Sequence, residues 1–171
     1  MNEIIVDGDV ARIQMFGGVE ALIDVADIDL ASTRHWCSVH REKDKTTYVQ
    51  SPGRRPAKTI TLHRLLLGFL EGQTVDHVNR NGLDNRRANL RIASQRQNLA
   101  NRRPWSATGL KGVYLQPERW IARGREGDRR VMLGAFRTAE EAARAYDTWA
   151  KGHFGEFAYL NYPELVDTTK I

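Results

Sequence analysis

Hydrophobic and polar residues alternate along much of the first sixty residues, and turn-forming residues interrupt the alternation. Apolar or alternating runs at 4–6, 11–16 and 21–25 are separated by an Asp-Gly-Asp turn and a Gly-Gly turn. Runs of this length with period-two alternation predict short strands joined by tight turns. A further hairpin is expected over residues 36–39 and 46–50. The N-terminal segment is therefore predicted to be rich in β-structure.

The central segment has a different pattern, which predicts one short helix and then a strand, a long turn, a strand and a second helix. The apolar block at 63–70 fits a short helix. Residues 74–78 and 90–93 fit two strands, and the Asn, Asp and Gly residues between them are turn formers. Ser94, followed three residues later by a glutamine, has the capping-box pattern of a helix that ends near residue 101.

Three period-two runs follow, over residues 113–116, 119–125 and 130–135. Each run has one apolar side and one side with arginine or other polar residues, which predicts three strands of one sheet. In the third run the alternation places Val131, Leu133 and Ala135 on the apolar side. The opposite side of the sheet is then expected to be open and rich in arginine.

A longer helix is predicted directly after these strands. Thr138 and Glu141 form a second capping-box pattern. The apolar residues of the segment recur at helical spacing and form one stripe, at Ala142, Tyr146, Trp149 and Ala150. The simplest fold is a three-stranded antiparallel sheet packed on this helix, so the whole chain is expected to be of the α+β class.

Composition and charge narrow the possible functions. The chain has 171 residues and 26 basic against 21 acidic residues, a net charge of +5, and residues 61–105 hold eight basic and three acidic ones. Arginines outnumber lysines 20 to 6, and the arginine fork grips phosphate groups, so a polyanionic partner is expected. A solvated surface is the other explanation of the same charge.

Cysteine content, hydropathy and the N-terminal sequence bear on the location of the protein. The single cysteine excludes an internal disulfide framework and fits a reducing compartment. The longest apolar run, residues 65–70, is far shorter than the roughly 20 residues that cross a bilayer. The N-terminal residues lack the pattern of a signal peptide. We therefore expect no membrane association and a cytoplasmic protein.

The strongest chemical signal is an Asp-His pair at residues 76 and 77. Asp76 offers a hard oxygen ligand, and His77 offers a base with an ordinary pKa of about 6.5. Asn98 lies 21 residues after the histidine, on the predicted helix that follows the second strand. Aspartate and asparagine oxygens suit Mg²⁺ or Mn²⁺. A metal ion that holds a phosphate beside an activating histidine would form a phosphodiesterase site.

The motifs LHRLLLG, VDHVNRNGLDNRRANLR and SQRQN cover residues 60–103 and resemble the HNH endonucleases of phage and intron-encoded homing type. The resemblance implies a ββα-metal core in which His77 is the general base and Asn89 orients it. Asp76 would be a metal ligand, and Asn98 would take the final ligand position, as in the HNN variant. Candidate phosphate contacts in this segment are His63, Arg64, Arg86 and Arg87.

A second resemblance covers residues 107–163. The motifs TGLKGVY, RWIA and LGAFRTAEEAARAYD, and the FG…AYLNYP that follows, are similar to the plant apetala-two/ethylene-response-factor DNA-binding domain. The resemblance implies that the open face of the sheet enters the major groove of double-stranded DNA. By position it points to Lys111, Tyr114, Gln116, Arg119, Arg123, Arg125, Arg130 and Met132 as DNA contacts. Several of these differ from the plant residues, so the plant target sequence is not expected here.

Taken together, the sequence predicts a β-rich region at 1–59, a nuclease core at 60–103, a DNA-binding domain at 107–163 and a tail at 164–171. The predicted activity is metal-dependent DNA cleavage by a homing-type endonuclease in a bacterial or phage-infected cell. Such an enzyme would be a monomer if it nicks and a dimer if it cuts both strands. Two alternatives stay open: a non-catalytic, sequence-specific DNA-binding regulator, and an RNA-binding or structural protein.

Overall fold

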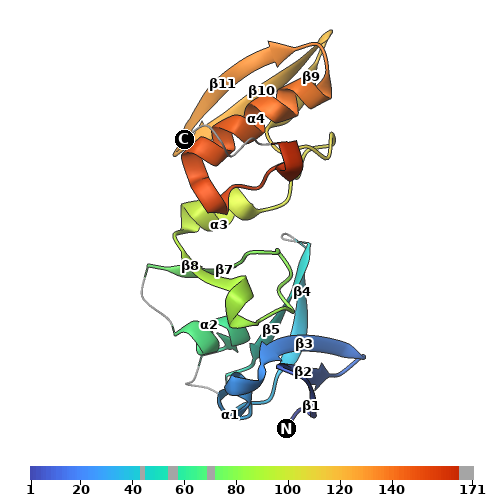
Figure 1. Ribbon diagram of the computed structural model, residues 1–171, viewed down its shortest axis with the longest axis vertical. Coiled ribbons are helices and arrows are strands. Elements are labelled where there is room, and N and C mark those ends of the chain that lie inside the picture. Colours follow the sequence, from blue (N-terminus) through green and yellow to red (C-terminus); the bar gives the residue numbers. More distant parts are fainter. Residues whose placement is uncertain (43–44, 54–57, 69–71, 166–171) are drawn as a thin grey trace. The chain divides into compact units, whose positions relative to one another are not determined.

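The computed structural model describes residues 1–42, 45–53, 58–68 and 72–165 (Figure 1). The chain forms two compact units, Met1–Gln95 and Arg96–Ile171. Each unit combines small antiparallel sheets with short or medium helices. The structure therefore has the mixed helix and sheet content that the sequence predicted, in two units where the sequence suggested three domains.

The first sheet of the N-terminal unit is an antiparallel meander with the strand order β1-β2-β3. Its strands are β1 (Ile4–Asp7), β2 (Val10–Met15) and β3 (Val19–Asp24). Side chains along β2 alternate between half-buried and buried positions, which confirms the prediction from the period-two pattern. Gly17 and Gly18 both have positive φ angles, of 81° and 74°, in the turn between β2 and β3.

Two further small sheets complete this unit. One has the order β4-β5-β6 and contains β4 (Cys37–Arg41), β5 (Thr46–Ser51) and β6 (Ile60–Thr61). The other pairs β7 (Thr74–His77) with β8 (Leu90–Ala93). The helices are η1 (Val25–Asp27), α1 (Ile28–Ala31), α2 (Leu62–Leu67) and η2 (Arg87–Asn89). Helix α2 was predicted over 63–70, of which residues 69 and 70 lie outside the described residues.

One hydrophobic core joins the parts of the N-terminal unit. Ile13 from β2, Trp36, Leu62 and Leu66 from α2, and Leu90 from β8 are all buried in the same cluster. The loop between β7 and β8 is also hydrogen-bonded to the edge of β3, through the backbone groups of residues 22, 83 and 85. The predicted boundary at 59/60 therefore does not separate two cores.

The C-terminal unit contains a three-stranded antiparallel sheet of the order β11-β10-β9. Its elements are α3 (Gln95–Asn101), β9 (Val113–Gln116), β10 (Arg119–Glu126), β11 (Arg129–Phe136), α4 (Ala139–Phe154), η3 (Gly155–Phe157) and η4 (Pro163–Leu165). Helix α4 lies along one face of the sheet (Figure 1). Buried Val113 and Ala122 of the sheet share a core with Ala142 and Ala143 of α4.

Helix α4 begins with the predicted capping box. The Glu141 backbone N–H donates to the Thr138 hydroxyl, and the Glu141 carboxylate accepts from the Thr138 backbone N–H, both at 3.2 Å. The helix then packs closely on the sheet, because a Cβ added at Gly124 of β10 would lie 2.6 Å from the Trp149 ring. Glycine at this position is what allows the Trp149 ring to lie against the strand.

The third strand departs from the predicted alternation. In the ladder of β10 and β11, Ala122 pairs with Gly134 while Arg123 pairs with Met132, so Leu133 is an extra residue in β11. This β-bulge reverses the order of the two faces along the strand. Ala135 is therefore exposed and does not share a face with Val131, and the prediction for these positions was wrong.

Candidate nucleic-acid interface

The predicted metal ligand Asp76 lies in a buried ion pair. It stands opposite Arg91 in the ladder of β7 and β8. The Arg91 Nε and Nη2 atoms lie 2.9 and 2.8 Å from the Asp76 Oδ2 atom. Only 5% of the Asp76 side chain and 13% of the Arg91 side chain are exposed. The guanidinium neutralises the carboxylate and links the two strands.

His77, the predicted general base, is buried in an aromatic cluster. Its ring centroid is 5.0 Å from that of His63, and the two planes are perpendicular, while Tyr48 lies 6.0 Å from each of them. The His77 Nε2 atom is 3.4 Å from the Asn85 Oδ1 atom. Burial lowers the pKa of His77, and it lowers the pKa of His63 to about 3. Both rings are therefore neutral at neutral pH.

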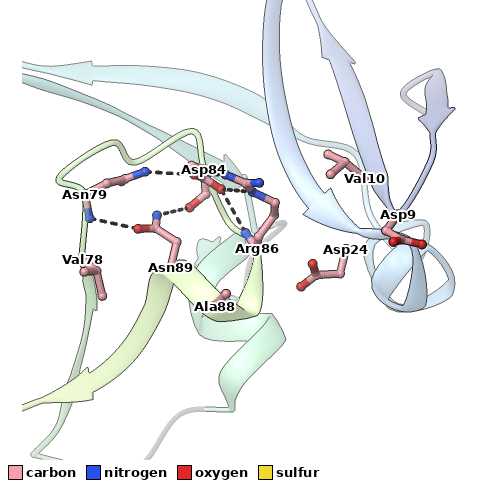
Figure 2. Close-up of a pocket in the computed structure, with 9 residues that line it drawn as sticks. All are labelled: Asp9, Val10, Asp24, Val78, Asn79, Asp84, Arg86, Ala88 and Asn89. Carbon is pink, nitrogen blue, oxygen red and sulfur yellow. Dashed lines mark hydrogen bonds and ion pairs between the residues drawn. The ribbon is translucent and has the colours of Figure 1, made fainter.

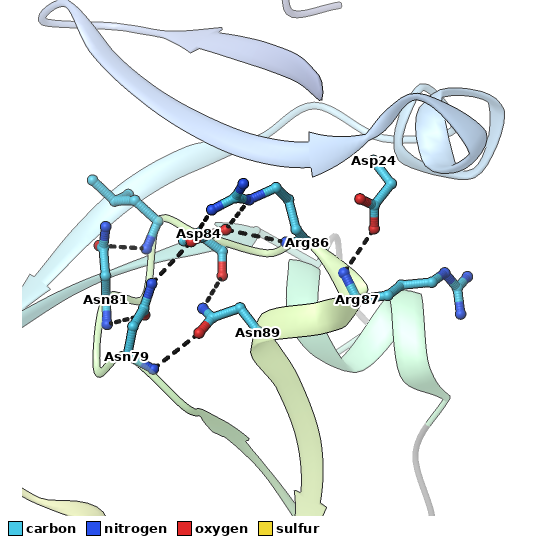
Figure 3. A network of polar contacts seen from close by, with 8 residues as sticks. Asp24, Asn79, Asn81, Asp84, Arg86, Arg87 and Asn89 are labelled. Atoms are coloured by element: carbon cyan, nitrogen blue, oxygen red, sulfur yellow. Dashed lines mark hydrogen bonds and ion pairs between the residues drawn. The ribbon is translucent and has the colours of Figure 1, made fainter. Parts of the chain in front are cut away.

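Asn89 holds the β7–β8 loop in shape. Its side-chain oxygen accepts the Asn79 backbone N–H at 2.9 Å, and its amide donates to the Asp84 backbone oxygen at 2.7 Å (Figure 3). Its own backbone oxygen accepts the Val78 N–H at 2.9 Å. Asn81 stabilises the same loop by accepting the Leu83 N–H. The loop is rich in asparagine because asparagine side chains can form hydrogen bonds with the backbone of a tight turn.

Two of the four candidate phosphate contacts are engaged by carboxylates of the same unit. Arg86 makes a bidentate contact with Asp84, with 2.8 Å from Nε and 2.8 Å from Nη2 (Figure 3). The Arg86 hydrogen bond lowers the pKa of Asp84. Arg87 binds Asp27 at 3.0 Å from Nε and 2.7 Å from Nη2. Planar forks that are already matched to carboxylates have fewer donors for phosphate.

The other two candidates, His63 and Arg64, lie on α2 and differ in exposure. His63 is buried, and its Nε2 atom is 3.0 Å from the Thr61 hydroxyl. Arg64 is half-buried on α2. Together with Arg91, which pairs with Asp76, three arginines of the basic block at 61–105 are thus bound to carboxylates of their own unit.

A pocket of about 400 Å³ lies beside the loop between β7 and β8 (Figure 2). Its charged lining consists of three carboxylates and one guanidinium, which belongs to Arg86 and faces Asp84. A net negative lining repels phosphate. The residues around the pocket are Asp9, Val10, Asp24, Val78, Asn79, Asp84, Arg86, Ala88 and Asn89.

Asn98, the fourth residue of the predicted catalytic set, lies on α3 in the C-terminal unit, whereas Asp76 and His77 belong to the N-terminal unit. Across the residues that the structure describes, no group of three or more His, Cys, Asp or Glu side chains is arranged to hold a metal ion. Among the described helices, none is long and apolar enough to span a membrane.

All the predicted DNA-contacting residues except Lys111 lie on the strands of the C-terminal unit, on the face of the sheet opposite to α4. Gln116 pairs with Arg119, Arg123 with Met132, and Arg125 with Arg130 across the ladders. All of them except half-buried Arg123 are exposed, as is Tyr114. We call this side of the sheet the open face. It consists of Tyr114, Gln116, Arg119, Ile121, Arg123, Arg125, Arg130, Met132 and Ala135.

Two arginines of the open face already have partners. The Arg123 guanidinium lies over the Tyr114 ring, 5.6 Å from its centroid. Arg125 donates from Nε to the Gly127 backbone oxygen at 3.0 Å and lies 3.4 Å from the Asp128 carboxylate. The first contact orients a side chain in the middle of the face, and the second stiffens the turn between β10 and β11.

Lys111 does not belong to the open face. Its ammonium donates to the backbone oxygens of Leu99, Ala100 and Arg102, at 3.2 Å to the first and 2.8 Å to the last. A cation at these orphan carbonyls caps the C-terminal end of α3. Its assignment as a DNA contact therefore disagrees with the structure, because the charge is used to hold α3.

The sequence also missed one exposed arginine at the rim of this sheet. Arg129 stands opposite Glu126 at the start of β11 and is exposed. The predicted third run began at residue 130 and so left Arg129 out. The signal that could have found it is its position next to the Gly127 turn, where a strand end leaves the core.

Comparison with known proteins finds similarity over part of the chain. The chain is 51% identical over 47 residues to dehydration-responsive element-binding protein 2A of Arabidopsis thaliana, a match of 26% of this chain and 14% of that protein. It is 49% identical over 49 residues to dehydration-responsive element-binding protein 2E of Oryza sativa subsp. japonica, or 28% of this chain and 15% of that protein. An ethylene-responsive transcription factor of Arabidopsis thaliana is 44% identical over 63 residues, or 35% of this chain and 34% of that factor.

The chain thus spans 14% to 34% of the length of these relatives. The similarity supports a domain like that of the apetala-two/ethylene-response-factor proteins within the chain. No protein-family model matches the chain, and no solved structure matches it. The resemblance of residues 60–103 to HNH endonucleases gains no support from these comparisons.

These findings correct four predictions. The relatives are named as element-binding proteins and a transcription factor, so the prediction of an endonuclease and of hydrolase chemistry was wrong. The prediction of a Mg²⁺ or Mn²⁺ cofactor was wrong as well. The described residues form no group of three or more His, Cys, Asp or Glu side chains that could hold a metal ion, and Asp76 is ion-paired with Arg91. The relatives are plant proteins, which overturns the expectation of a bacterial or phage-infected cytoplasm.

Proposed function

We propose that the C-terminal unit binds double-stranded DNA through the open face of its sheet, and that the chain is a sequence-specific DNA-binding regulator. The observation that carries this proposal is the arrangement of the sheet. One face is covered by α4, while the other presents several arginines, a tyrosine and a glutamine across three paired strands. Similarity to a protein named as a dehydration-responsive element-binding protein supports the same function.

The shape and chemistry of the open face suit a major groove. The groove of B-DNA is about 12 Å wide and admits a β-ribbon. Arginine can form bidentate hydrogen bonds with guanine or contact phosphates, and glutamine can pair with adenine. The ladders of β10 with β9 and β11 fix the register of the strands, and the close approach of Gly124 to Trp149 holds α4 against the opposite face. A rigid scaffold lowers the entropic cost of binding.

We assign DNA binding to the second unit because three arginines of the central basic block are bound to carboxylates of the first unit. Arg86, Arg87 and Arg91 contact Asp84, Asp27 and Asp76 within their own unit. Arg119 and Arg130 are exposed at opposite ends of the open face. The long-range attraction for a polyanion therefore comes from the sheet.

Selection from a random double-stranded DNA library with the full chain tests the proposal. We expect an enriched sequence, and weaker binding to unrelated DNA and RNA. Arg119→Ala and Arg130→Ala are expected to weaken binding and, for a phosphate contact, to lower the slope of log K against log salt by about one. Arg144→Ala is the matched control, because Arg144 is exposed on α4 and pairs with Glu140 at 2.6 Å. Equal binding to unrelated DNA and RNA with no enrichment would contradict the proposal.

A further inference from the structure

The open face is not uniformly basic: an apolar row crosses its middle. Tyr114, Ile121 and Ala135 pair directly across the three strands. Ile121 is only 4% exposed, although it lies on the uncovered side of the sheet, whereas Tyr114 is 45% exposed. The row therefore has a buried aliphatic floor with an exposed aromatic ring at one end and the exposed Ala135 methyl at the other.

Met132 adds an exposed thioether next to this row. It is 63% exposed and pairs across the ladder with Arg123. The Arg123 guanidinium in turn lies over the Tyr114 ring. One oriented cationic fork thus stands beside one flexible apolar side chain. Ala135 belongs to this face only because Leu133 forms the bulge in β11.

This pairing has a matching feature in the major groove. Guanine presents two acceptors to an arginine fork, and the one apolar group on the base edges is the methyl at C5 of a pyrimidine. Thymine carries that methyl, and 5-methylcytosine carries the same group. A methionine side chain is polarisable and adapts to such a small apolar surface.

We propose, on the basis of the DNA-binding function above, that Met132 reads the C5 methyl group of a pyrimidine next to a guanine bound by Arg123. Tyr114 orients Arg123 through its ring, and Ala135 and Ile121 keep the neighbouring surface apolar. Methylated and unmethylated pyrimidines are distinguished because only a methylated base places an apolar group against the Met132 thioether.

The test uses the sequence selected by the full chain. Each thymine of that site is replaced in turn by uracil, which removes the methyl group and keeps every hydrogen-bonding atom. In a second arm each cytosine is replaced by 5-methylcytosine. We expect one position at which the methylated base binds about fourfold more tightly, the effect of burying one methyl group. The arm in which this position is found identifies the source of the methyl group.

Met132→Ala is expected to abolish the difference between the methylated and unmethylated probes while still selecting a site. Leu115→Ala is the matched control, because Leu115 is 62% exposed on β9 and pairs with Trp120 rather than with a residue of the open face. The control should keep the fourfold difference. Circular dichroism verifies that both variants fold.

Three results separate the failure of this inference from that of the proposed function. A selected site that shows no methyl effect at any position overturns the methyl contact and leaves sequence-specific binding intact. A methyl effect that persists in Met132→Ala overturns the role of Met132. Failure to select any site overturns both the inference and the function on which it rests.

Discussion

Arg87 and Asp27, which are 60 residues apart in the sequence, form a bidentate ion pair in the N-terminal unit. The Asp27 side chain is 4% exposed and that of Arg87 is 51% exposed. The Arg87 backbone N–H also donates to Asp24 at 2.7 Å. Arg87 therefore links the central segment to Asp24 at the end of β3 and to Asp27 in η1, within one compact unit.

Removal of Arg87 is expected to destabilise the N-terminal unit. Arg87→Ala leaves the Asp27 carboxylate buried without its guanidinium, and we expect a loss of about 1–2 kcal/mol, less than for a fully buried pair because Arg87 is half exposed. Hydrogen exchange of the backbone amides of β3, β7 and β8 measures the loss. Adding Asp27→Asn should recover part of it.

Arg12→Ala is the control for this prediction, because Arg12 pairs with Asp7 at the surface of the same unit. Its effect is expected to stay below about 0.5 kcal/mol. A loss in Arg87→Ala no larger than in Arg12→Ala would show that the pair with Asp27 does not hold the two segments together.

The buried histidines make the N-terminal unit sensitive to acid. The folded pKa of His63 is about 3 and its ordinary value is 6.5, because burial disfavours the imidazolium ion. Between these two values the unfolded chain binds more protons, so stability is full above pH 6.5 and falls as the pH falls. The loss approaches about 1.4 kcal/mol per pH unit for one such histidine. His77, whose pKa is also lowered, adds to it.

Denaturant unfolding at pH 7.5, 6.5 and 5.5 measures this dependence. His63→Gln should flatten the slope without removing it, since His77 remains. His40→Gln serves as the matched control, because 51% of the His40 side chain is exposed. A wild-type unit whose stability does not change between pH 7.5 and 5.5 would contradict the prediction.

Local patterns were sufficient to predict most strands and the cap of α4, because alternation and capping depend on neighbours in the sequence. The bulge at Leu133 was not predictable in this way, since it exists only in the pairing of β10 with β11. The charge count could not show that Arg87 is ion-paired, because its partner Asp27 lies in a distant segment. The pair of Asp76 and Arg91 could have been found by assigning a register to the two predicted strands.

Much of the candidate interface was predictable, because the sheet face follows from alternation. Arg119, Arg125 and Arg130 are exposed on it as expected. Lys111 was missed as a structural residue because its partners are backbone oxygens at the end of α3, which no side-chain pattern reveals. The contact of Arg123 with Tyr114 also requires the paired strands, since the two residues are not neighbours in the chain.

Gly124 is expected to be essential for the packing of α4 on the sheet. In Gly124→Ala the new methyl would lie 2.6 Å from the Trp149 ring, so the helix or the ring must move. We expect a loss of about 1–3 kcal/mol, typical of overpacking. Gly152→Ala, in α4, has no atom within 4 Å of the new methyl. It is expected to stabilise the unit by up to about 1 kcal/mol, because alanine favours the helix. Thermal unfolding of both variants checks the opposite signs.

Lys111 and Arg130 are expected to differ in what their loss changes. Lys111→Met removes the cation from the carbonyls of α3 and should lower the stability of the C-terminal unit by about 1–2 kcal/mol. The salt slope of DNA binding should stay the same. Arg130→Met should leave stability within about 0.5 kcal/mol, because Arg130 is exposed, and lower the salt slope by about one. Fluorescence anisotropy over a range of salt concentrations, with hydrogen exchange of α3, measures both quantities. A reduced salt slope in Lys111→Met with unchanged exchange would instead place Lys111 on the DNA.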